Sequence, residues 1–114
     1  MEKPMYPAPS RDIAQTREKL APDILRAFQS FSREVVADGA LPSRTKELIA
    51  IAAALVTQCP YCIRSHTKRA RVKGVSEQQI MKAIWVAAEM RAGGAISHSV
   101  LAIDAMKETE AAWE

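Results

Sequence analysis

Apolar residues recur at intervals of three and four along most of the chain, which is the spacing of one face of an α-helix. No segment alternates apolar and polar residues over several positions, so no β-strand is predicted. The segments with helical spacing are 11–20, 22–37, 43–57, 60–74, 76–92 and 96–106. We therefore predict an all-α fold, a compact bundle of about six helices.

Residues typical of helix ends mark several of these segments. Pro60 fits the first position of the fourth helix, and Gly74 fits its C-terminal cap. Ser76 and Gln79 have the spacing of a capping box at the start of the fifth helix. We expect the Gly93-Gly94 pair to end that helix, so that a sixth helix can begin after it.

The first ten residues differ from the rest of the chain. Segment 1–10 contains three prolines and no apolar run, so we expect a flexible arm there and a single helical domain over 11–114. The arm lacks the apolar region of a secretory signal, which favours a cytoplasmic location. The longest apolar run, 48–56, is nine residues. A bilayer needs about 20, so no membrane segment is predicted.

Charge and composition restrict the choice of partners. The net charge of +3 is too small by itself to predict a nucleic-acid or membrane partner. The cations of segment 64–73 are scattered around their helix without interleaved aromatics, so a solvated face is favoured over a nucleic-acid interface. After Glu47, the third helix is apolar on nearly every face. Such a helix must be surrounded by the rest of the domain or by another subunit.

The candidate chemistry lies in Cys59-Pro60-Tyr61-Cys62, which contains both cysteines of the chain. Two thiols at this spacing can form a disulfide, bind a metal or share a proton. If Pro60 is the first helical residue, Cys59 is the N-cap and Cys62 lies in the first turn, where unpaired backbone N–H groups stabilise a thiolate. In a reducing compartment such a pair is more often catalytic or metal-binding than a permanent bridge.

His66 and Glu47 can be placed relative to this pair by helix geometry. His66 follows Cys62 by four residues, one helical turn further on the same face. Glu47 lies about 15 Å before the end of its helix and His66 about 10 Å into the next, so an antiparallel pair brings them to similar heights. A Glu47–His66 hydrogen bond, direct or through water, then becomes feasible, with His66 exchanging protons with the thiols.

The pattern Glu47, eleven residues, Cys59-Pro60-Tyr61-Cys62, three residues, His66 resembles the active-site signature of the alkyl hydroperoxidase D-like (AhpD-like) branch of the carboxymuconolactone decarboxylase-like proteins. The resemblance runs from about Leu41 to Ile103. It implies an AhpD-like fold, homo-oligomers that are often trimers or hexamers, and a peroxide-reducing thiol cycle without a cofactor. The substrate is then a hydroperoxide, and an external dithiol resets the enzyme.

The same resemblance implies a role for each residue of the signature. Cys62 matches the attacking, peroxidatic cysteine, and Cys59 matches the partner that donates a proton and then resolves the sulfenic acid as a Cys59–Cys62 disulfide. His66 and Glu47 match the proton relay. Tyr61 stands where the hydroperoxidase usually has His or Ser, and a phenol is a poorer base near neutral pH. General disulfide reduction, or peroxides of another kind, therefore stay open as activities.

Two other activities are alternatives to the thiol cycle. Cys59, Cys62, His66 and Glu47 would supply two thiolates, an imidazole and a carboxylate, enough for tetrahedral zinc. The absence of a second cysteine pair and the helix-opening motif favour redox chemistry, so no metal is expected. The second alternative is the lyase reaction after which the wider family is named. Lactone decarboxylases of the family generally lack the cysteine pair.

Overall fold

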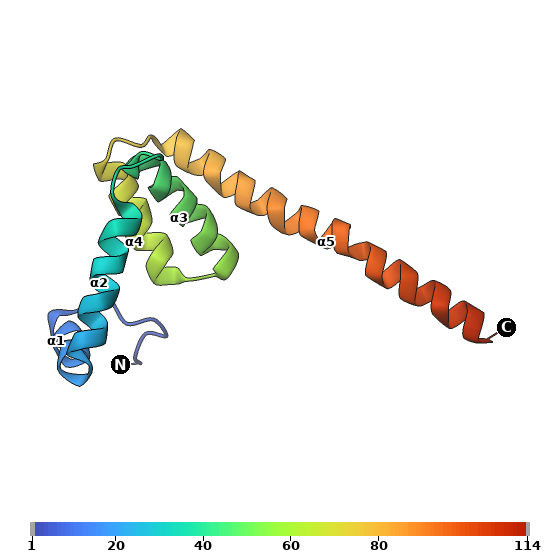
Figure 1. Ribbon diagram of the computed structural model, residues 1–114, viewed down its shortest axis with the longest axis horizontal. Helices are drawn as coiled ribbons and strands as arrows, with labels where there is room; N and C mark the ends of the chain where they lie inside the picture. The colour runs from blue at the N-terminus through green and yellow to red at the C-terminus, as the bar shows by residue number, and fades with distance from the viewer. Residues whose placement is uncertain (1, 114) are drawn as a thin grey trace. The chain divides into compact units, whose positions relative to one another are not determined.

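The computed structural model describes residues 2–113, with side chains as far as residue 110. This part of the chain folds into five α-helices and contains no strand (Figure 1). The helices are α1 (Arg11–Leu20), α2 (Pro22–Val36), α3 (Ser43–Thr57), α4 (Pro60–Val72) and α5 (Glu77–Trp113). The predicted all-α class is confirmed, and the first four helices lie where the apolar spacing predicted them.

The predicted helix break at Gly93-Gly94 is wrong, so the described residues form five helices where about six were expected. α5 is 37 residues long and continues through both glycines. Neither glycine adopts the positive φ that often ends a helix. Glycine in a helix costs about 1 kcal/mol relative to alanine, but it keeps its backbone donor and so does not interrupt the hydrogen bonds. Ala, Ile and Met around the pair are compatible with helix, so the propensity of the neighbours prevails.

The chain divides into two units, Met1–Lys46 and Glu47–Glu114, and each is described by itself. The expectation of one domain over 11–114 stays a prediction. In the first unit, residues 2–10 form neither helix nor strand. Ser10 then caps α1, because its hydroxyl oxygen accepts the Ile13 N–H at 3.2 Å. Pro22 begins α2, and α1 and α2 bury none of their residues.

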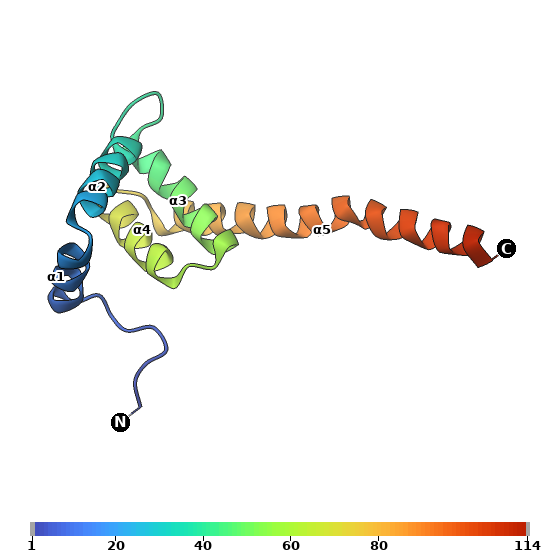
Figure 2. The ribbon, with the colours of Figure 1, turned by 60° about the horizontal axis from the view of Figure 1, so that its bottom comes forward.

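The second unit contains the core, where α3 and α4 lie side by side and the start of α5 packs with them (Figures 1 and 2). The fully or nearly buried members of this core are Ile51, Ala70, Val75 and Ile80. Leu48, Leu55 and Ile84 pack against them from the edge. Burial of these aliphatic side chains is the main force that holds the helices together. It fixes the relative position of α3 and α4, the two helices that carry the candidate site.

The connection from α4 to α5 is built from two cap motifs. Gly74 adopts φ 84°, and the N–H groups of Gly74 and Val75 donate to the carbonyls of Arg71 and Ala70, both at 3.0 Å. These are the two bonds of a Schellman motif. The predicted capping box follows: the Gln79 N–H donates to Ser76 Oγ at 3.1 Å and the Ser76 N–H to Gln79 Oε1 at 2.9 Å.

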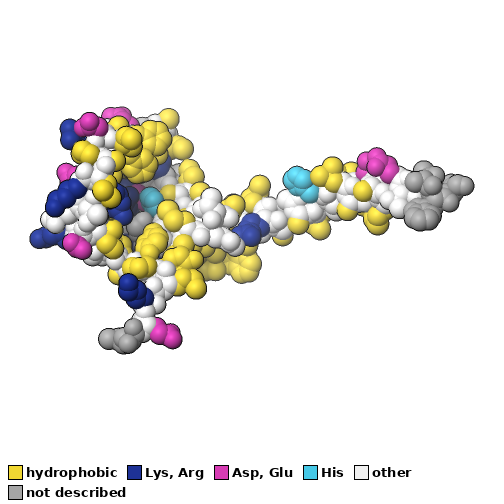
Figure 3. Space-filling view, turned by 90° about the horizontal axis from the view of Figure 1, so that it is seen from below, with side chains coloured by type: hydrophobic (Ala, Val, Ile, Leu, Met, Phe, Trp, Pro, Cys, Tyr) yellow, Lys and Arg dark blue, Asp and Glu magenta, His cyan; other side chains and the backbone are white. Residues whose placement is uncertain are grey.

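The C-terminal part of α5 remains largely exposed in the single chain. Beyond Ala87, no described side chain of this helix is buried. Large apolar side chains nevertheless recur along it, as the space-filling view shows (Figure 3). They include Ile96, Val100, Leu101, Ile103 and Met106. None of the described helices, α5 included, is both long enough and apolar enough to cross a lipid bilayer.

Candidate thiol site

The junction between α3 and α4 positions Cys59. After α3 ends at Thr57, Gln58 adopts φ 59°, in the left-handed region. This turn directs the Cys59 N–H to the carbonyl of Ala54 at 3.0 Å. Cys59 is at the same time the N-cap of α4, where its Sγ accepts the Cys62 N–H at 3.3 Å. One residue therefore closes α3 and opens α4, as the sequence predicted for the N-cap.

The two thiols are in direct contact. Both cysteines are free and partly buried, and their Sγ atoms lie 2.6 Å apart. The side-chain hydrogen bond with Cys62, followed by the hydrogen bonds of the Cys62 and Tyr61 backbone N–H groups, lowers the pKa of Cys59. The hydrogen bond to Cys59, burial and the Cys59 charge raise the pKa of Cys62. The shared hydrogen bond therefore favours the thiolate on Cys59 over the thiolate on Cys62.

Glu47 and His66 form the hydrogen bond that helix geometry predicted. Glu47 lies on α3 with 1 % of its side chain exposed, and its Oε2 accepts from Nδ1 of His66 on α4 at 2.8 Å. Since an ionised carboxylate only accepts, Nδ1 carries the proton of this bond. In a neutral imidazole, Nε2 is then the free acceptor. His66 lies one turn after Cys62, and 20 % of its side chain is exposed.

Lys73 is a member of this cluster that the sequence analysis did not identify. Its Nζ donates to Glu47 Oε1 at 2.9 Å, so each oxygen of the buried carboxylate has its own partner. By sequence, Lys73 is only one of the scattered cations of segment 64–73, for which a solvated face is favoured. The signal that could have identified Lys73 is its spacing. Cys59, His66 and Lys73 follow one another at intervals of seven residues, and each interval is two helical turns. Such positions share one face of α4.

The charge state of Glu47 follows from this environment. Burial by itself raises the pKa of the carboxyl group, but the hydrogen bonds from His66 and Lys73, with their charges, outweigh it. The net pKa of Glu47 is lowered. Glu47 is therefore an anion at neutral pH, held beneath the surface by two donors. A buried carboxylate of this kind is stable only while its partners stay in place.

Tyr61 lies in the first turn of α4, between the two cysteines, with 42 % of its surface exposed. Its backbone N–H contributes to the low pKa of Cys59. Through this group Tyr61 acts on the pair as any residue at that position would.

The zinc alternative needs at least three ligands that converge on one point. Among the described His, Cys, Asp and Glu side chains, no group of three or more is arranged to hold a metal ion.

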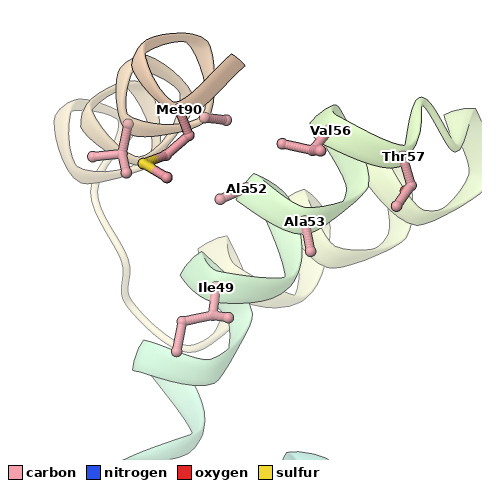
Figure 4. Close-up of a pocket in the computed structure, with 8 residues that line it drawn as sticks. Ile49, Ala52, Ala53, Val56, Thr57 and Met90 are labelled. Atoms are coloured by element: carbon pink, nitrogen blue, oxygen red, sulfur yellow. The ribbon is translucent and has the colours of Figure 1, made fainter. Parts of the chain in front are cut away.

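An apolar groove opens between α3 and α5 in the same unit (Figure 4). Its volume is about 390 Å³. The residues that line it are Ile49, Ala52, Ala53, Val56, Thr57, Val86, Ala87 and Met90. Thr57 stands two residues before Cys59, so the groove reaches the end of α3 from which the thiol motif begins. Such a lining suits an alkyl chain or another apolar helix.

Comparison with known proteins identifies several relatives of this chain. An uncharacterized protein of the cox locus of Paracoccus denitrificans is 56% identical over 86 residues, which cover 75% of this chain and 78% of that protein. A carboxymuconolactone decarboxylase family protein of Legionella pneumophila has a similar crystal structure, with TM-score 0.65 and 30% identity over 86% of this chain and 90% of that one.

A second solved structure comes from Thermotoga maritima, with TM-score 0.56 and 27% identity over 75% of this chain and 92% of that one. That family member has been suggested to take part in an antioxidative response. The sequence model of the carboxymuconolactone decarboxylase family matches residues 22–105, a range that includes every member of the Glu47, Cys59, Cys62 and His66 signature. The chain therefore belongs to the carboxymuconolactone decarboxylase family.

Proposed function

We propose that the protein is a thiol-dependent peroxidase or disulfide oxidoreductase of the AhpD-like branch, acting in a reducing, cytoplasmic compartment. The observation that carries the proposal is the contact between the two sulfurs, 2.6 Å apart at the N-terminus of α4. A thiol beside a thiolate holds both the nucleophile and the proton that a peroxide reduction consumes. The relative from Thermotoga maritima, suggested to act in an antioxidative response, supports the same chemistry.

The first step of the proposed cycle begins with the shared proton. It moves from Cys62 to Cys59 within the 2.6 Å contact, which leaves Cys62 as the thiolate. The Cys62 sulfur then attacks the terminal oxygen of a hydroperoxide, ROOH, and the O–O bond breaks. Cys62 is oxidised to a sulfenic acid, while the leaving alkoxide takes the proton of Cys59 and departs as the alcohol. Cys59 is again a thiolate.

In the second step, Cys59 attacks the sulfenic acid of Cys62 and forms the Cys59–Cys62 disulfide. The hydroxide that leaves takes a proton from the imidazolium of His66 and departs as water, and Glu47 stabilises that imidazolium while it is charged. An external dithiol reduces the disulfide, and its two protons return to Cys62 and His66, which regenerates the Cys62 thiol, the Cys59 thiolate and the imidazolium. The hydrogen bond of 2.8 Å between Glu47 and His66 supports this relay, because it orients the ring one turn after Cys62.

The experiment adds one equivalent of an organic hydroperoxide to the reduced protein, followed by thiol titration and mass spectrometry. We expect both thiols to disappear and the mass to fall by two hydrogen atoms. Cys62→Ser should abolish peroxide consumption. Cys59→Ser should still react once and leave a sulfenic acid on Cys62. A wild-type protein that keeps both thiols with peroxides and with small disulfides alike would refute the proposal.

The lyase reaction of the wider family is the second candidate, because the matching model carries the name of that reaction. A lactone decarboxylation does not consume thiols. A Cys59→Ser, Cys62→Ser double variant therefore separates the two functions: a decarboxylase would retain its release of carbon dioxide from the lactone, whereas the proposed oxidoreductase would lose its turnover.

We also propose that the protein acts as a homo-oligomer, a trimer or a hexamer. The apolar groove between α3 and α5 and the exposed apolar side chains further along α5 support this proposal, since contiguous apolar surface of this kind is typical of subunit interfaces. Light scattering coupled to size-exclusion chromatography measures the molar mass directly. A value near the 12.5 kDa of one chain would contradict it.

A further inference from the structure

We propose that Lys73 is a positioning residue of the thiol site, one that balances the charge of Glu47 so that His66 can both hold and release a proton. This inference rests on the proposed function, because the relay is the process in which His66 would exchange that proton. Lys73 itself has no contact with the two sulfurs among those described. Its effect passes through Glu47.

The geometry divides the Glu47 carboxylate between two donors. Oε1 accepts from Lys73 Nζ at 2.9 Å and Oε2 from His66 Nδ1 at 2.8 Å. Both distances are those of charge-assisted hydrogen bonds. Because Glu47 is 1 % exposed, water has little access to the carboxylate. These two side chains are the groups whose hydrogen bonds and charges act on Glu47.

Charge balance explains why one partner would not be enough. With His66 alone, the buried anion would be neutralised only while His66 keeps its second proton, so the imidazolium would be trapped. With Lys73 present, the Glu47–Lys73 pair is already neutral. The loss of a proton from Nε2 of His66 then leaves no uncompensated charge beneath the surface. The ring can therefore take up and release a proton in successive turnovers.

The fold holds Lys73 in place for this purpose. Lys73 is the C-cap of α4, directly before Gly74, whose positive φ and Schellman bonds fix the direction of the chain at that point. The residue after Gly74 is Val75, which is 1 % exposed and is anchored in the core. Lys73 lies two helical turns after His66, so both reach Glu47 from the same face of α4. One third of the Lys73 side chain is exposed, which leaves its charge partly hydrated.

The test is an NMR titration of the ring protons of His66 in the full-length protein. The chain has two histidines, and His98, whose Nδ1 lies 2.8 Å from the Gly94 carbonyl on α5, is the internal reference. In Lys73→Met we expect the His66 titration midpoint to move to higher pH, because a nearby positive charge is lost. Lys73→Arg keeps the charge and should restore the midpoint. Lys68→Met removes a cation of the same helix and should change nothing.

A second measurement protects the test against a misfolded variant. In the Glu47→Gln background, Lys73→Met should move the His66 midpoint less than in the wild type, because Lys73 has lost the carboxylate that holds its ammonium group near the ring. If Lys73→Met leaves the wild-type midpoint unchanged, or shifts His98 as much as His66, the inference is wrong. These results do not depend on turnover. Should the protein prove inactive on peroxides and disulfides, the proposed function would fail while the titration still decided the role of Lys73.

Discussion

Replacing Glu47 by glutamine removes the charge at the centre of the site while keeping the shape of the side chain. Two charge-assisted hydrogen bonds, of 2.8 and 2.9 Å, lose their ionised acceptor. Each such bond is worth about 1.5–3 kcal/mol. The partners are 20 % and 33 % exposed and can be hydrated again, so the smaller value applies to each. Since glutamine still forms weaker hydrogen bonds, we expect a net loss of about 2 kcal/mol of unfolding free energy at pH 7.

The pH dependence of this loss provides an independent check. The pKa of Glu47 is lower in the folded protein than its ordinary value of about 4.3. The carboxylate therefore contributes its full stabilisation above the ordinary value and loses it as the pH falls through the folded one. The difference between wild type and Glu47→Gln should be present at neutral pH and should shrink in acid, as the pH falls through the lowered pKa of Glu47.

Urea unfolding at a fixed protein concentration measures the difference. The matched control is Glu77→Gln, which removes an exposed carboxylate 3.9 Å from Arg71. We expect that change to cost no more than about 0.5 kcal/mol. The reasoning fails if Glu47→Gln is as mild as its control, or if the difference between wild type and variant is the same at acidic and neutral pH.

Three further predictions concern the helices and the thiols. Gly94→Ala should raise the unfolding free energy by about 0.5–1 kcal/mol, because the position is inside α5 and a methyl group meets no atom within 4 Å; a loss in thermal or urea unfolding would contradict the continuous helix. Gln58→Gly should stabilise by up to about 1 kcal/mol, since φ 59° strains a residue with a side chain, and unchanged urea unfolding would argue against that strain. Cys59 should react with iodoacetamide faster than Cys62 at neutral pH, because its pKa is lowered while that of Cys62 is raised; peptide mass mapping that finds Cys62 labelled first would contradict this assignment.

Helix boundaries were predictable wherever a residue changes the backbone itself. Pro60 removes a donor, Gly74 admits a positive φ, and the Ser76–Gln79 box satisfies two donors at the start of α5. Each of these effects is local, and each prediction is confirmed. Gly93-Gly94 misled the prediction because glycine only lowers helix propensity. The long helical neighbourhood on both sides outweighs that small cost.

The candidate site was predictable as far as helical spacing reaches. Spacing on one helix predicted that Cys59, Cys62 and His66 lie on one face. The lengths of two helices predicted that Glu47 and His66 lie at similar heights, and their hydrogen bond confirms this. Lys73 was not found, although it lies on the same face of α4. Its distance to Glu47 depends on the end of the helix and on the packing of α3 against α4, neither of which a local pattern reports.

The sequence by itself determined the helical class, most of the helix ends and which residues form the signature. The reason is that period, capping and motif are local properties of the chain. Only the tertiary structure decided which charges meet. The packing of α3 against α4 buries Glu47 and selects His66 and Lys73 as its two partners. The 2.6 Å contact of the sulfurs lowers the pKa of Cys59 and raises that of Cys62. Electrostatic energies depend on distance and hydration, and both are fixed only when the helices pack.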